Sequence, residues 1–78
     1  MTSLGLLLEL DDRIEELRGM IHVQQQRIAQ TELEGRDPTN ARKALEVLER
    51  HLREAASQRD QVLGELEHQK REMKRRVN

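Results

Sequence analysis

Residues 41–73, ARKALEVLERHLREAASQRDQVLGELEHQKREM, decide the fold of this chain. Read at alternating steps of four and three residues, the stretch gives a seam that is apolar except at Arg59 and Gln69. Its members are Ala41, Leu45, Leu48, Leu52, Ala55, Arg59, Val62, Leu66, Gln69 and Met73. This spacing is the repeat of a coiled coil, and a strand cannot use it because strand side chains alternate with period two. The second half is therefore predicted to be one long helix with a single apolar stripe.

The first half of the chain carries a matching seam. Its members are Leu7, Leu10, Ile14, Leu17, Ile21, Gln24, Ile28 and Thr31. A helix is therefore predicted over residues 4–34. A polar seam residue such as Gln24 fixes register or oligomeric state at some cost in stability. Gly19 lies inside this helix, either for a close helix approach or as a tolerated surface glycine that costs about 1 kcal/mol relative to Ala.

The start of this helix has two alternatives. Thr2 or Ser3 can cap a helix that begins at Leu4. Asp12 and Glu15 have the spacing of a capping box, which would begin the helix later. The early start is favoured because the apolar seam is already unbroken before this box.

The only strong break between the two helices is the turn GRDP at residues 35–38. Gly35 suits the left-handed position after a helix end. Asp37 can cap the next helix with Pro38 in its first position, and Thr39 is the alternative cap. So short a turn makes the helices fold back on each other. The sequence thus predicts an all-α fold, an antiparallel two-helix coiled-coil hairpin.

Composition limits the core of such a hairpin. The chain has 78 residues, of which 37% are charged and 35% apolar, and none is aromatic. A chain of this size forms one domain, here residues 1–78 with the second helix over residues 39–76. Because a two-helix chain buries only one stripe per helix, dimerisation into a four-helix bundle is expected.

The absence of cysteine excludes disulfides and thiol chemistry, and a reducing cytoplasm is the expected compartment. No stretch approaches the roughly 18 apolar residues that suggest a membrane span. The apolar run Leu4–Leu8 has neither a basic start nor a cleavage site, so a signal peptide is not expected. We therefore expect a cytoplasmic protein without a membrane segment.

Folding the chain about its turn brings the two seams together. The facing pairs are Ile28 with Leu45, Ile21 with Leu52, Ile14 with Arg59, and Leu7 with Leu66. Asp11 and Glu15 are candidate ion-pair partners for Arg59. Five further acid–base pairs at i,i+4 support exposed helix faces: Glu9–Arg13, Glu32–Arg36, Glu46–Arg50, Glu49–Arg53 and Glu67–Arg71.

Three leucines near the N-terminus, Leu4, Leu6 and Leu8, exceed what one seam requires. This end is expected to pack on a partner chain, and a frayed apolar terminus is the alternative. The residues expected in a dimer or partner interface are Leu4, Leu6, Leu7, Leu8, Leu10, Ile14, Leu17, Ile21, Ile28, Leu45, Leu48, Leu52, Val62, Leu63 and Leu66.

Charge is divided unevenly between the halves. Residues 1–39 hold four Arg against eight Asp or Glu, a net −4, and residues 40–78 hold ten Lys or Arg against seven Asp or Glu, a net +3. Four acids are expected in early helix turns, where they suit the macrodipole: Asp11, Asp12, Glu15 and Glu16. The basic end consists of Lys70, Arg71, Lys74, Arg75 and Arg76. This end is the candidate contact for nucleic acid or an acidic partner, and a solvated helix end is the simpler interpretation.

Catalytic or metal chemistry has little support. Glu65 and His68 have the Glu-x-x-His spacing of di-iron bundles, but both lie beside the seam and only Glu9 is near them in the first helix. His22 and His51 are expected to be structural or solvated. No nucleophile has a base and an orienting group, and there is no glycine-rich phosphate loop. We therefore predict no enzyme activity, no cofactor and no metal.

Residues 22–67 resemble a group of short two-helix proteins of rhizobia and related α-proteobacteria for which no activity is known. The matching positions are His22-Val23, Gln25 or Gln26, Ile28, Leu33, Gly35, Asp37, Ala41, Leu45, Leu48 and Leu52. Those proteins usually have Thr directly after the Asp, whereas here Pro38 comes before Thr39. The resemblance implies a helical hairpin of bacterial origin and no particular activity.

Surplus apolar side chains without attached chemistry suggest a non-catalytic protein–protein interaction module, a small adaptor or regulator. They are Leu4, Leu6, Leu8, Met20, Leu33 and Leu63. A homodimer and a protein partner are expected. The alternative is a small bundle that binds RNA or DNA through its basic end. The absence of aromatic residues argues against it, because it removes base stacking.

Overall fold

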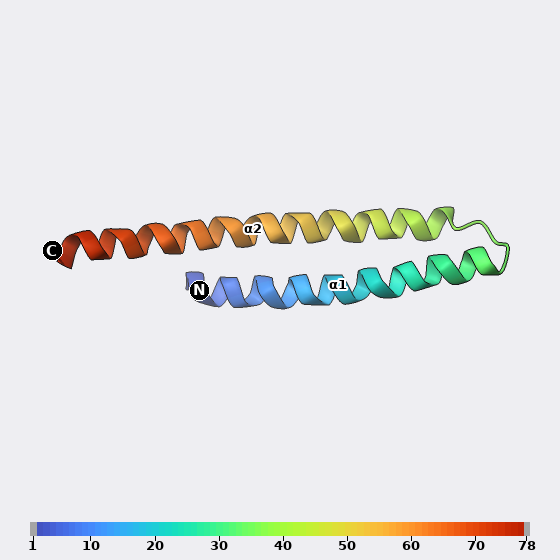
Figure 1. Cartoon of the computed structure of the whole chain (residues 1–78), viewed down its shortest axis with the longest axis horizontal. Helices are drawn as coiled ribbons and strands as arrows, with labels where there is room; N and C mark the ends of the chain where they lie inside the picture. The colour runs from blue at the N-terminus through green and yellow to red at the C-terminus, as the bar shows by residue number, and fades with distance from the viewer. Residues whose placement is uncertain (1, 78) are drawn as a thin grey trace.

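The computed structural model describes residues 2–77, and their side chains through residue 75. It consists of α1, Ser3–Leu33, and α2, Thr39–Val77. The chain reverses direction between the helices, and α1 lies along α2 for its whole length (Figure 1). The molecule is a rod of 68 × 17 × 15 Å. The predicted all-α class is confirmed, and no strand occurs in residues 2–77.

The first helix begins early. Thr2 has extended backbone angles, and its hydroxyl accepts a hydrogen bond of 3.0 Å from the backbone N–H of Gly5. This is the N-cap arrangement, in which a side-chain oxygen satisfies a backbone donor that has no partner in the helix. The capping-box alternative at Asp12 is therefore wrong, and the leucine-rich segment from Leu4 onward is helical.

The end of α1 is closed by backbone hydrogen bonds around a left-handed glycine. Gly35 has φ of +72°, as predicted. Its N–H donates to the carbonyl of Glu32, and the N–H of Arg36 donates to the carbonyl of Thr31, both at 3.0 Å. This pair of bonds is the Schellman motif, which satisfies helix-end carbonyls.

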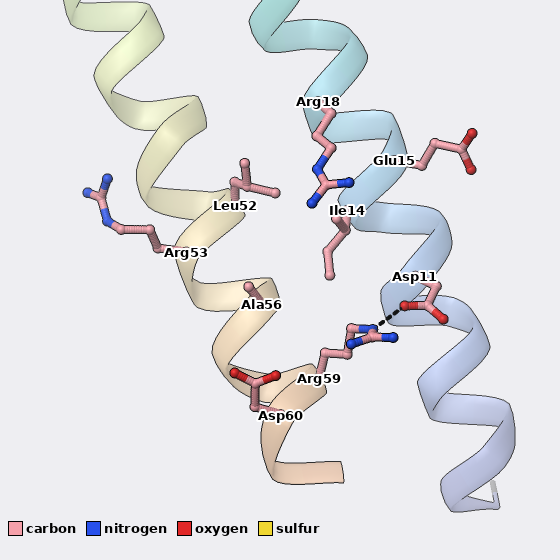
Figure 2. Close-up of a pocket in the computed structure, with 9 residues that line it drawn as sticks. All are labelled: Asp11, Ile14, Glu15, Arg18, Leu52, Arg53, Ala56, Arg59 and Asp60. Atoms are coloured by element: carbon pink, nitrogen blue, oxygen red, sulfur yellow. Dashed lines mark hydrogen bonds and ion pairs between the residues drawn. The ribbon is translucent and has the colours of Figure 1, made fainter. Parts of the chain in front are cut away.

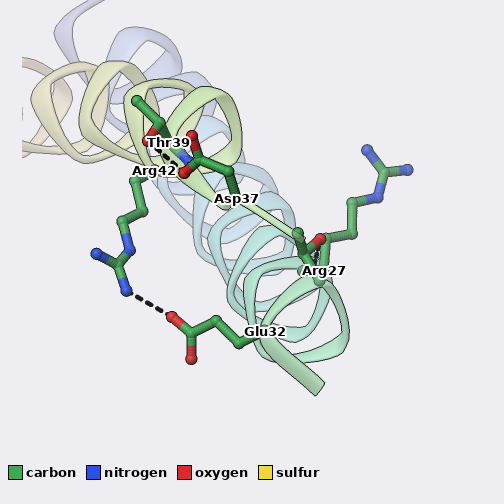
Figure 3. Close-up of polar contacts among 6 residues, drawn as sticks. Arg27, Glu32, Asp37, Thr39 and Arg42 are labelled. Atoms are coloured by element: carbon green, nitrogen blue, oxygen red, sulfur yellow. Dashed lines mark hydrogen bonds and ion pairs between the residues drawn. The ribbon is translucent and has the colours of Figure 1, made fainter. Parts of the chain in front are cut away.

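Asp37 caps the start of α2 (Figure 3). Its carboxylate accepts from the backbone N–H of Thr39 at 3.0 Å and from the hydroxyl of the same residue. Thr39, the alternative cap, therefore serves as a donor. The hydroxyl bond above all, then the backbone bond and the charge of Arg42, lower the pKa of Asp37 below its ordinary value of 3.8.

Asp37→Ala is expected to lower the melting temperature at neutral pH, because it removes this cap. Because the pKa is lowered, the carboxylate stabilises the fold at every pH above its ordinary pKa of 3.8. This contribution is lost as the pH falls through the lower pKa of the folded state. The difference in melting temperature should therefore shrink in strongly acidic buffer, as measured by circular dichroism. Asp37→Asn, which keeps an oxygen acceptor, is the control. Equal melting temperatures at neutral pH would contradict this account of the turn.

The seam residues form the core. Every seam member of α1 is buried or half-buried, and so is every seam member of α2 up to Leu66. The five most buried are Leu10, Ile14, Leu17, Ala55 and Val62. Leu48 and Leu52 pack against the central cluster. The core thus lies in the middle and N-terminal part of α1, while the seam near the turn is only half-covered.

Two polar seam residues bond across the helices. The side-chain amide of Gln24 donates to the carbonyl of Ala41 at 2.9 Å. Arg59 forms an ion pair with Asp11, one of its two expected partners. Both bonds favour one longitudinal register, because a shift by one turn would separate the partners by about 5 Å.

The exposed i,i+4 pairs behave differently from expectation. Within residues 2–75, none of the five expected pairs forms an ion pair. Glu32 instead reaches across the turn to Arg42 (Figure 3). Such solvent-exposed pairs contribute little, so the seam carries the stability of the fold.

Leu17→Ala tests the importance of this core. Leu17 is 4% exposed, and emptying such a site costs about 2–5 kcal/mol of unfolding free energy. Leu33 lies in the same helix but is 83% exposed, so Leu33→Ala should change stability by less than about 0.5 kcal/mol. Urea unfolding monitored by circular dichroism measures both. Equal effects of the two substitutions would mean that the seam is not the core.

Candidate interaction site

An apolar end is the most prominent surface of the rod. Leu4 is 59% and Leu8 is 60% exposed, although both are leucines in a regular helix. Leu7, Leu63 and Leu66 are half-buried beside them. We call these five residues the leucine patch. Adjacent exposed leucines of this kind are typical of a surface that another chain covers.

The ion pair of Asp11 with Arg59 fixes which parts of the helices share a level. Counting outward from it, Leu7 reaches the level of Leu63, and Leu4 that of Leu66. The leucine patch therefore draws on both helices at one end of the rod. This count differs by about one turn from the expected pairing, in which Leu7 faces Leu66 and Ile14 faces Arg59, because Arg59 pairs with Asp11.

A groove with charged walls lies between the two helices around Asp11 and Arg59 (Figure 2). Its floor is Ile14 and Leu52, which point toward each other between the helices. Arg59 spans the groove to reach Asp11. Glu15 and Arg53 point away from the interhelical space on the two sides. Among the described side chains, the groove contains no buried polar atom without a hydrogen-bond partner.

Residues 9–16, which we call the acidic stretch, hold five acids and one Arg. The helix begins at Ser3, so the first turn holds no acid, and the macrodipole explanation of this stretch is wrong. Two like-charged pairs at i,i+4, Asp11 with Glu15 and Asp12 with Glu16, are instead mildly destabilising. Among the side chains described, only Asp11 of this stretch has an ion-pair partner. The acidic stretch is therefore costly to the isolated chain and needs another explanation.

The second helix projects past the start of α1 (Figure 1). Leu66 is its last half-buried seam residue, while Gln69 is exposed and Met73 is 67% exposed. We call residues 67–77 the C-terminal extension. Four of its basic side chains are exposed: Lys70, Arg71, Lys74 and Arg75. The fifth, Arg76, lies outside the described side chains.

A second apolar strip lies on the other side of the seam. Met20 and Val23 line a groove with Leu48, and Val47 is exposed nearby on α2. Gly19 borders this groove, and a Cβ added there would meet nothing within 4 Å. Gly19 thus allows no close approach within this chain. Val23 and Val47 were not predicted as interface residues. The sequence feature that could have identified them is an apolar residue directly before a seam residue, since Val23 precedes Gln24 and Val47 precedes Leu48.

The expected interface residues divide into two groups. Those turned toward the other helix are Leu7, Leu10, Ile14, Leu17, Ile21, Ile28, Leu45, Leu48, Leu52, Val62, Leu63 and Leu66. Those left exposed are Leu4, Leu6 and Leu8. The first group is largely used within the chain, so only its half-buried members and the exposed leucines remain for a partner.

The Glu-x-x-His pair lies on the surface. Glu65 and His68 border a shallow groove of α2, and His68 pairs with Glu72 at 3.2 Å. His22 is exposed and His51 half-buried. Within the described part of the chain, no three His, Asp or Glu residues come together in a way that could hold a metal ion.

No protein family, curated protein or solved structure matches this chain. The resemblance to two-helix proteins of α-proteobacteria therefore stays a prediction. Over residues 2–77, neither helix combines the length and apolar character that crossing a membrane requires.

Proposed function

We propose that this chain is a single-domain, non-catalytic protein–protein interaction module, a small cytoplasmic adaptor or regulator. In this proposal it is an antiparallel coiled-coil hairpin that dimerises into a four-helix bundle. The observation that carries the proposal is the exposure of Leu4 and Leu8 in a helix whose seam residues are all buried or half-buried against α2.

The size of the core supports association. Only five apolar residues are buried, and none of the side chains described is completely enclosed. Small helical chains of this kind usually need a second copy to reach useful stability. A second layer of helices would cover the half-buried seam residues near the turn as well as the exposed leucines.

The two apolar surfaces support an adaptor. Leu4 and Leu8 lie on one side of the seam, at positions that follow it, whereas Met20 and Val23 lie at positions that precede it. A dimer that uses the leucine patch leaves the Met20 strip free. One chain can then hold its copy with one side and a helix of another protein with the other, in the helix-in-groove manner.

Light scattering across a concentration series tests the proposal. The expected result is a helical species of twice the chain mass of 9.2 kDa, because a second copy covers the exposed leucines. The measurement needs refractive-index detection, since the chain lacks Trp and Tyr. Leu4→Gln with Leu8→Gln should shift the species toward monomer, while Leu33→Gln should not. A well-folded monomer at every concentration would reject the homodimer and leave a heterologous partner.

The second candidate is binding of RNA or DNA through the C-terminal extension. It is favoured by the exposure of Lys70, Arg71, Lys74 and Arg75 on a helix end that projects past the start of α1. Phosphate contacts by such residues are strongly salt-dependent. Lysines and arginines at a helix C-terminus also favour the macrodipole, which accounts for part of this pattern without a ligand.

A gel-shift assay with duplex DNA and with RNA hairpins at low salt separates the two candidates. The interaction module predicts no shift. A shift that weakens with salt would establish the nucleic-acid function in its place, provided that it is lost on changing Lys70, Arg71, Lys74, Arg75 and Arg76 to Gln. Changing Arg27, Arg36, Lys43, Arg50 and Arg53 to Gln is the matched control with equal loss of charge.

A further inference from the structure

We infer that two copies of this chain associate tail to tail, with their leucine patches at the two-fold axis and the C-terminal extension of each copy beside the acidic stretch of the other. This inference rests on the proposed dimeric function and assigns its interface. Three surfaces that the single chain leaves unexplained are used together: the exposed leucines, the unpaired acids and the unpartnered end of α2.

The three surfaces follow one another along the rod. The acidic stretch begins two residues after Leu7, and the basic residues of the extension begin four residues after Leu66. Because α1 and α2 run in opposite directions from this end, the two charged stretches lie on opposite sides of the leucine patch (Figure 1). At 1.5 Å per residue, both lie within roughly 15 Å of it.

The three surfaces also face the same side. On α1, one stripe at steps of four and three contains Leu4, Leu8, Asp11 and Glu15. On α2, the corresponding stripe contains Ala56, Asp60, Leu63, Glu67, Lys70 and Lys74. Members of both stripes, Asp11 and Glu15 from α1 with Ala56 and Asp60 from α2, line one groove (Figure 2). The stripes therefore open onto one side of the rod, where a second copy meets both.

A two-fold axis through the leucine patch makes this surface complementary to itself. The axis places leucine against leucine and exchanges the two sides of the patch. The extension of one copy, with net charge +3, then lies at the level of the partner's acidic stretch, with net charge −4. The like-charged acid pairs, which are unfavourable in one chain, gain counter-charges in the dimer.

Other placements of the axis are less favourable. An axis through the extension would set two strongly basic segments against each other. An axis at the middle of the rod would set the extension beside the partner's turn. There Glu32 and Glu34 already pair with arginines, and Asp37 with Thr39. Only the axis at the leucine patch pairs both unmatched charged stretches.

Charge reversal tests the arrangement. Lys70→Glu with Lys74→Glu, and separately Asp12→Lys with Glu15→Lys, should each raise the dimer dissociation constant on the order of tenfold or more. A chain carrying both pairs restores the complementarity and should return to within about threefold of the original. Lys43→Glu with Arg50→Glu, near the turn, is the matched control. Sedimentation equilibrium at several salt concentrations measures the constants, and circular dichroism verifies that each variant is helical.

Cysteine cross-linking gives a second measurement, because the chain has no cysteine of its own. Glu67→Cys lies beside the inferred axis and should form a disulfide-linked dimer on oxidation. Arg53→Cys lies about 20 Å from the axis, so its two copies are too far apart for a disulfide, which needs Cα atoms within about 7 Å.

The outcomes separate this inference from the proposed function. A dimer that is indifferent to both charge reversals, or that cross-links through Arg53→Cys and not Glu67→Cys, overturns the tail-to-tail arrangement and leaves the interaction module intact. A chain that is monomeric at all concentrations overturns the homodimer itself. Recovery of the dimer in the chain with both reversals supports the arrangement, since a general effect on folding would not be reversed by further substitutions.

Discussion

Two helices can bury only one stripe each against one another, and the rest of this structure follows from that constraint. The radius of gyration is 18.7 Å, whereas a compact domain of this length has about 11.5 Å. In a rod so thin, no side chain is far from solvent. The apolar seam holds the helices together, Gln24 and Arg59 favour one register, and the turn closes both helix ends with well-formed caps. The apolar side chains beyond the seam, such as Leu4 and Leu8, stay exposed in the single chain.

The arrangement of charge has the same origin. In a globular domain, acids at i,i+4 on an exposed helix are easily neutralised by neighbouring elements. Here α1 has only one neighbour, and Arg59 reaches only Asp11. The acidic stretch and the C-terminal extension are therefore left as separate, opposite charges on either side of the leucine patch. In the proposed dimer, a second copy supplies the opposite charges, because the same chain carries both the acidic stretch and the basic extension.

Local rules of helix chemistry predict much of this fold. The heptad spacing predicts which residues are buried. Gly35 ends α1 and Asp37 caps α2, as predicted, and Arg59 pairs with Asp11, one of its two expected partners. The polar contacts between the helices could not be derived from the sequence, because they depend on the relative position of both helices and on side-chain conformation. The side-chain amide of Gln24 donates a hydrogen bond to the carbonyl of Ala41. Glu32 forms an ion pair with Arg42 across the turn and not with Arg36, the partner expected at i,i+4. The partner and the process in which it acts leave no local pattern, so they stay proposals.

The central claim is that one chain is too thin to be stable alone and gains its stability from association. Thermal unfolding, followed by circular dichroism over about two orders of magnitude in protein concentration, tests it most directly. If folding is coupled to association, the melting temperature rises steadily with concentration, because mass action stabilises the assembled form. A melting temperature that is high and the same at every concentration would contradict the claim, since the two-helix rod would then be sufficient by itself.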